Sequence, residues 1–89
     1  MTSEFLKAFD ALPPGTFTGT YQGRQYVVTR QDFSGGKSQK LVAEELGGRD
    51  YISLNVYRLK QNAVLKPCEM PEDKVISFVL GLVPSDQQT

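Results

Sequence analysis

The sequence predicts an α+β fold: an antiparallel meander sheet of four to five strands, with an N-terminal and a C-terminal helix packed on one face. Three observations predict it. Apolar residues recur at helical spacing near both ends of the chain, they alternate with polar residues in its middle, and glycine-containing turns separate the alternating stretches. The chain has 89 residues, the size of one small domain. We expect residues 1–84 to form that domain and residues 85–89 to form a polar C-terminal tail.

The first expected element is a short helix over residues 3–12. Phe5, Phe9 and Leu12 stand at positions i, i+4 and i+7, which places them on one helix face. The Pro-Pro-Gly sequence that follows ends the helix, because proline removes a backbone donor and restricts the residue before it.

Period-two alternation predicts the strands. They are expected over residues 16–21, 24–31, 50–59 and 63–66. Residues 37–46 fit either a helix or a fifth strand. A helix there would place Glu44 and Glu45 at its negative end, where carboxylates are unfavourable, so a strand is the preferred interpretation.

A second helix is expected to begin at Pro71, because proline is favoured at the first helical position. Its apolar stripe is wider than one sheet face needs. We therefore expect a symmetric homodimer that buries part of this excess. The expected dimer-interface residues are Ile76, Leu80 and Val83.

Missing residue types exclude several classes of site. The chain has no histidine and one cysteine, Cys68. It therefore has no Ser-His-Asp or Cys-His nucleophile pair, and no set of zinc ligands. We expect a non-enzymatic protein with no metal and no cofactor. No apolar run approaches the roughly 20 residues of a membrane span, so no membrane partner is expected and the predicted location is cytoplasmic.

The charges are segregated although their sum is zero. Residues 24–66 carry eight Lys and Arg against four Asp and Glu, a net charge of +4. Residues 1–23 carry a net charge of −1, and residues 67–89 one of −3. A basic sheet with acidic helices can orient an anionic partner onto the sheet. Lys and Arg on small sheets also serve to block edge-to-edge pairing, and the sequence leaves both interpretations open.

Aromatic residues interleave with these cations. In the clearest strand Tyr51 and Tyr57 share one face, opposite Ile52, Leu54 and Val56. Rings and cations on an exposed sheet are what single-stranded nucleic acid needs, because bases stack on rings while cations contact phosphates. The candidate nucleic-acid-binding residues are three tyrosines for stacking, Tyr26, Tyr51 and Tyr57, and four cations for phosphates, Arg30, Lys37, Lys40 and Arg58.

The order of elements also suggests a family. The chain reads YVVTRQDF, a glycine turn, KLVAEEL, DYISLNVYRL and then AVLKPCEMPEDKVISFVLGL. Over about residues 24–83 this order resembles the transcriptional-coactivator type of single-stranded-DNA-binding domain. The resemblance implies a curved four-stranded sheet followed by a dimerising helix, with single strands bound on the basic aromatic sheet. The alternative is a small protein-interaction or homodimerisation module with no nucleic-acid role, in which the tyrosines pair across strands or fill an interface.

Overall fold

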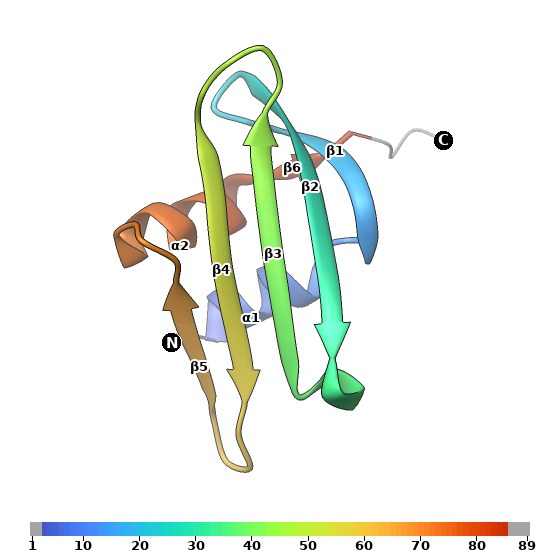
Figure 1. The fold of residues 1–89 in the computed structure, drawn as a ribbon, viewed down its shortest axis with the longest axis vertical. Coiled ribbons are helices and arrows are strands. Elements are labelled where there is room, and N and C mark those ends of the chain that lie inside the picture. Colours follow the sequence, from blue (N-terminus) through green and yellow to red (C-terminus); the bar gives the residue numbers. More distant parts are fainter. Residues whose placement is uncertain (1–2, 86–89) are drawn as a thin grey trace.

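The computed structural model describes residues 3–85 (Figure 1). Its elements follow one another as α1 (Ser3–Ala11), β1 (Gly15–Tyr21), β2 (Arg24–Phe33), the 3-10 turn η1 (Ser34–Gly36), β3 (Ser38–Glu45), β4 (Tyr51–Arg58), β5 (Ala63–Pro67), α2 (Glu72–Gly81) and β6 (Val83–Pro84). The predicted α+β class and antiparallel meander are confirmed, with six strands in the order β5-β4-β3-β2-β1-β6.

The ambiguous segment is the strand β3. Gln39, Leu41 and Ala43 are buried and alternate with residues that are less buried, which is the period of a strand. The strand pairs along its length with β2 on one side and with β4 on the other. It is therefore the central strand of the meander.

The sixth strand was not predicted. α2 ends at Gly81, and Leu82 has an extended backbone, with φ −72° and ψ 132°, that turns the chain along β1. Val83 then pairs with Thr20, and the Ser85 amide donates to the Thr18 carbonyl at 2.9 Å. The expectation that Val83 extends the apolar stripe of the helix is wrong, and contacts with β1 continue to Ser85, the first residue of the expected tail. Residues 86–89 lie outside the described part of the chain.

A glycine makes this return possible. A Cβ atom on Gly19 would lie 2.9 Å from the Leu82 Cδ1 atom and 3.0 Å from the Val83 carbonyl oxygen. Both distances are shorter than ordinary contacts, so a larger residue would push β6 away from β1.

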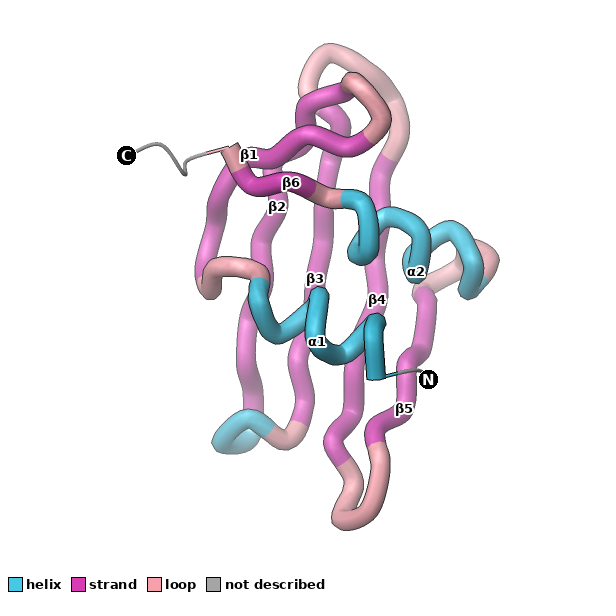
Figure 2. The backbone as a smooth tube through the Cα atoms, turned by 180° about the vertical axis from the view of Figure 1, so that it is seen from behind, coloured by secondary structure: helices cyan, strands magenta, loops and turns pink. Residues whose placement is uncertain are grey.

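Both helices lie on the same face of the sheet, as two opposite views show (Figures 1 and 2). Apolar residues of α1 and α2 meet the inward residues of β2, β3, β4 and β5 there and form one core, against which Phe17 and Tyr21 of β1 are partly buried. Its largest fully buried side chains are Phe5, Phe9, Tyr26, Val28, Leu41, Ile52, Leu54, Val56, Val75, Phe78 and Val79. The opposite face of the sheet is covered by no described element, and we call it the open face.

Candidate functional site

Strand register arranges the open face in rows that run across the strands. At the end where β4 finishes, one row contains Phe33 of β2, Ser38 of β3 and Tyr57 of β4. The neighbouring row contains Gln31, Lys40, Asn55 and Lys66. Successive rows are two residues apart, which is about 6.7 Å along a strand.

Two aromatic side chains stand out of this face at the same end. Phe33 is 47% exposed and Tyr57 is 41% exposed, and they flank the smaller Ser38 from the two neighbouring strands. Phe33 was missed because the strand was expected to stop at Gln31. The alternation in fact continues for two more residues, up to the turn at Ser34, and this signal was present in the sequence.

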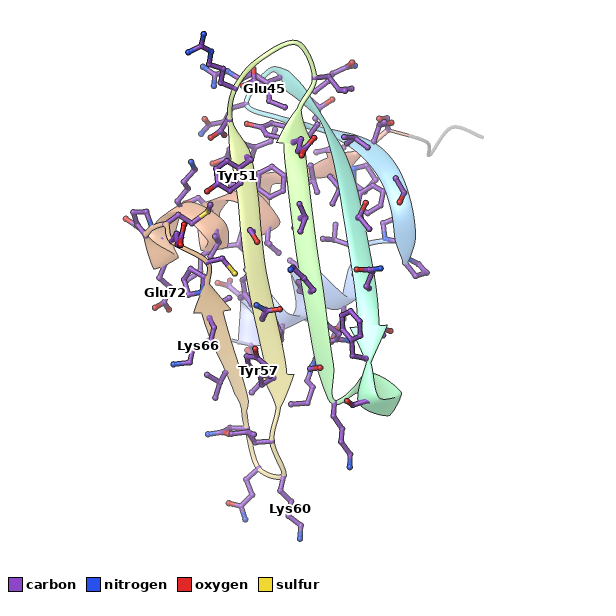
Figure 3. The ribbon with its side chains drawn as sticks, viewed as in Figure 1. Glu45, Tyr51, Tyr57, Lys60, Lys66 and Glu72 are labelled. Atoms are coloured by element: carbon purple, nitrogen blue, oxygen red, sulfur yellow. The ribbon has the colours of Figure 1, made fainter. Side chains whose placement is uncertain are left out.

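Four lysines lie on the strands and turns at the same end of the sheet as the two rings. Lys40 and Lys66 stand in the neighbouring row on either side of Asn55, while Lys37 and Lys60 lie in the two turns at this end of the sheet. Figure 3 shows Tyr57, Lys60 and Lys66 toward that end. Among residues 3–85, none of the four ammonium groups has an ion-pair or hydrogen-bond partner. We call Phe33, Tyr57 and these four lysines the lysine–aromatic patch.

Charge differs at the other end of the open face. Tyr51 is 46% exposed there, but its neighbour on β3 is Glu44, where a lysine would be needed to hold a phosphate. Tyr57 lies six positions after Tyr51 along β4, which is about 20 Å. The structure therefore brings Lys37 and Lys40 together with Tyr57, and it places Tyr51 on the same face at a distance.

Two candidate residues face the helices instead of the open face. The ring of Tyr26 is 1% exposed and packs edge-on against Phe78, with 4.9 Å between ring centroids. The Nη1 atom of Arg30 donates to the carbonyl oxygens of Phe9, at 3.2 Å, and Leu12, at 3.0 Å. The prediction that Tyr26 and Arg30 contact nucleic acid is wrong. Both share a strand face with Val28, which is fully buried.

Arg58 also lies on the helix side. Its Nε atom donates to the Gln39 Oε1 atom at 2.9 Å, and its Nη2 atom forms an ion pair with the Asp10 carboxylate of α1. Arg58 thus links α1 to the sheet, and it lies on the face opposite the lysines with which it was expected to contact phosphates. Period two already placed it opposite Tyr57 on β4.

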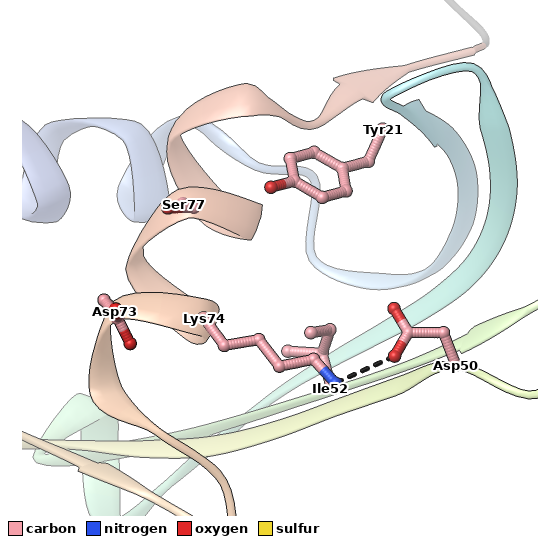
Figure 4. Close-up of a pocket in the computed structure, with 6 residues that line it drawn as sticks. All are labelled: Tyr21, Asp50, Ile52, Asp73, Lys74 and Ser77. Atoms are coloured by element: carbon pink, nitrogen blue, oxygen red, sulfur yellow. Dashed lines mark hydrogen bonds and ion pairs between the residues drawn. The ribbon is translucent and has the colours of Figure 1, made fainter.

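A hollow of about 260 Å³ opens beside α2 and is lined by Tyr21, Asp50, Ile52, Asp73, Lys74 and Ser77 (Figure 4). The Lys74 Nζ atom donates to one oxygen of Asp50 at 2.8 Å, and the Tyr26 hydroxyl donates to the other oxygen at 2.8 Å. These contacts tie α2 and β2 to the start of β4. They occupy both oxygens of the Asp50 carboxylate.

The same contacts shift two pKa values. Burial, followed by the hydrogen bond to Asp50, raises the pKa of Tyr26 to about 12. The hydrogen bond from Lys74 is the largest influence on Asp50 and lowers the pKa of that carboxyl. The Tyr26 hydroxyl consequently stays protonated and Asp50 stays ionised around neutral pH. We call Tyr26, Asp50 and Lys74 the latch, because their contacts connect β2 and α2 to the start of β4.

The expected dimer residues differ in exposure. Ile76 is partly buried against the core of its own chain, whereas Leu80 is 49% exposed and Val83 is 63% exposed. Within residues 3–85, no three His, Cys, Asp or Glu side chains gather as a metal-ligand group, and no helix is both long and apolar enough to cross a bilayer.

Comparisons with protein-family models, with curated proteins and with solved structures give no match to this chain. The resemblance to the transcriptional-coactivator type of single-stranded-DNA-binding domain accordingly stays a prediction.

Proposed function

We propose that this protein binds single-stranded nucleic acid on the lysine–aromatic patch. The observation that carries the proposal is the set of four unpartnered lysines and two exposed rings at one end of a sheet face that no described element covers. The nearest carboxylate on β2, Asp32, lies on the other strand face and pairs with Arg30 at 3.7 Å. An anion that approaches the patch meets an uncompensated positive field.

The rings favour single strands over duplexes. Phe33 and Tyr57 project from an open sheet, and such a ring stabilises nucleic acid by stacking on the face of a base. In a duplex those faces are covered by neighbouring bases. The lysines would contact the phosphates of the same strand, so affinity would fall as salt rises.

Tyr57→Ala tests the patch against a matched control. Tyr57 and Tyr51 are on the same strand and the same face, with similar exposure, and only Tyr57 lies among the lysines. We expect Tyr57→Ala to weaken binding of a labelled single-stranded oligonucleotide by roughly 1–3 kcal/mol, the usual loss for one stacked base. Tyr51→Ala is expected to leave the affinity unchanged. Equal effects of the two substitutions, or no binding by the unmodified protein at low salt, would contradict the proposal.

A second candidate function is homodimerisation through the α2 side of the molecule. Exposed Leu80 and Val83 favour it, because both are apolar and stand out of neighbouring elements. Sedimentation at micromolar concentration is expected to show a dimer that the double change Leu80→Ser and Val83→Ser converts to a monomer. A monomeric unmodified protein would exclude this candidate.

A further inference from the structure

Phe33 and Tyr57 stand on either side of Ser38 in one row of the open face, and we call the space over Ser38 between them the gap. They stand on the two strands that flank β3, so their backbones are two strand spacings apart, about 9.6 Å. One base held between two rings separates their planes by roughly 7 Å, twice the ~3.4 Å rise per base. Rings that lean slightly inward would therefore stack on both faces of a single base. The small Ser38 side chain between them leaves room for the edge of that base.

The neighbouring row supplies hydrogen-bonding groups at one side of this gap. Gln31, Lys40 and Asn55 stand side by side there, about 6.7 Å further along the strands. Within residues 3–85 the side chains of Gln31 and Lys40 have no partner, and the Asn55 amide has only a 3.5 Å contact to the sulfur of Cys68. All three can donate hydrogen bonds to a base that lies over Ser38.

We infer that this gap is a purine-selective base pocket, an inference that rests on the proposed function. Adenine and guanine both present the N7 acceptor on the edge that amide and ammonium donors recognise, and guanine adds O6. Thymine presents only the O4 acceptor beside its methyl group, and cytosine presents an amino donor, so neither offers the N6 and N7 pair that an Asn or Gln amide bonds bidentately on adenine. Lysine and amide donors therefore favour purines, and the larger purine ring also covers more of the two aromatic faces.

The test uses three labelled oligonucleotides and the unmodified protein. The first is an oligothymidine, the second has two deoxyadenosines at its centre, and the third has 7-deaza-deoxyadenosine in their place. Fluorescence anisotropy should show the adenine strand binding about fivefold more tightly than oligothymidine, the factor for roughly one net hydrogen bond. The deaza strand should lose most of that gain, because it keeps the ring area but lacks the N7 acceptor.

Two lysine variants separate base contact from phosphate contact. Lys40→Met should reduce the ratio of adenine to thymidine affinity, since it removes a donor of the pocket. Lys66→Met should weaken both strands equally, because Lys66 lies on the far side of Asn55 from the gap. Equal binding of all three strands by the unmodified protein would overturn the purine pocket and leave single-strand binding standing. Failure of all three strands to bind would instead overturn the proposed function.

Discussion

Replacing Arg30 with methionine separates a structural role from a nucleic-acid contact. The Arg30 guanidinium stands over the Phe9 ring, with 5.1 Å from its carbon to the ring centroid, and its Nη1 atom donates to the carbonyls of Phe9 and Leu12. Phe9 lies in the last turn of α1, where its carbonyl also accepts from the Leu12 amide at 3.2 Å, and Leu12 follows the end of the helix. Methionine keeps an unbranched apolar side chain and removes both the donors and the guanidinium over the Phe9 ring.

The expected loss follows from those contacts. A hydrogen bond from a charged group contributes roughly 1.5–3 kcal/mol, and Arg30 makes two of good length. The Arg30 Nε atom is buried without a hydrogen-bond partner, which costs stability in the unmodified protein. Removing this atom therefore recovers about 1–3 kcal/mol of the stability that the lost hydrogen bonds remove. We expect a net loss of about 2 kcal/mol in the free energy of unfolding.

Denaturation followed by circular dichroism measures this loss. In a domain of this size each kcal/mol lowers Tm by about 4–8 °C. Oligonucleotide affinity should be unchanged for the folded Arg30→Met protein, measured well below its Tm. Unchanged stability together with weakened oligonucleotide binding would refute the account and place Arg30 on the binding face.

Three further changes test the core and the latch. Tyr26→Phe should lower stability by roughly 1 kcal/mol at neutral pH through the lost hydrogen bond to Asp50. The folded-state pKa of Tyr26 is raised from 10.0 to about 12, so the stability that Tyr26 contributes is complete below pH 10 and disappears between pH 10 and about 12. Thermal melts over that pH range should therefore show a smaller loss of stability for Tyr26→Phe than for the unmodified protein. The pKa of Asp50 is lowered from 3.8, so the stability that Asp50 contributes is present above pH 3.8 and disappears as the pH falls through the folded-state pKa. Urea titrations at several pH values should show that stability falls less steeply with acid in Asp50→Asn than in the unmodified protein. An unchanged slope would argue against the latch. Gly19→Ala should destabilise the fold by about 1–3 kcal/mol through the short contact with Leu82, and hydrogen exchange should show faster opening of β6; an unchanged exchange rate would mean that β6 tolerates the added carbon.

Strand alternation explains why the sheet could be predicted and where the prediction failed. The inward residues of β3 and β4 alternate cleanly with polar ones, so their faces could be assigned from the sequence. In β2, Tyr26 and Arg30 are amphipathic, and period two says only that they share a face. Their burial depends on α1 and α2, whose position over the sheet arises from long-range packing and is not visible in the strand itself.

Strand alternation also predicted part of the lysine–aromatic patch. Lys40 and Tyr57 were expected to act together, and strand register does bring them to one end of the open face. Lys60 and Lys66 were not selected, because their nearness to Tyr57 depends on the β4–β5 hairpin. Val83 continued the helical spacing of apolar residues in the sequence, so it was assigned to the helix. In the structure the chain leaves the helix after Gly81 and pairs with β1, which is possible because Gly19 has no side chain that would meet Leu82.

The salt dependence of oligonucleotide binding tests the central claim most directly. Each phosphate neutralised on a single strand contributes a slope of roughly −0.7 to the logarithm of affinity against the logarithm of salt concentration. With the four lysines of the patch engaged, the slope should approach about −3. The double change Lys40→Met and Lys66→Met should reduce it by about 1.4. The same slope in the double variant, or affinity that does not change with salt, would contradict single-strand binding at the lysine–aromatic patch.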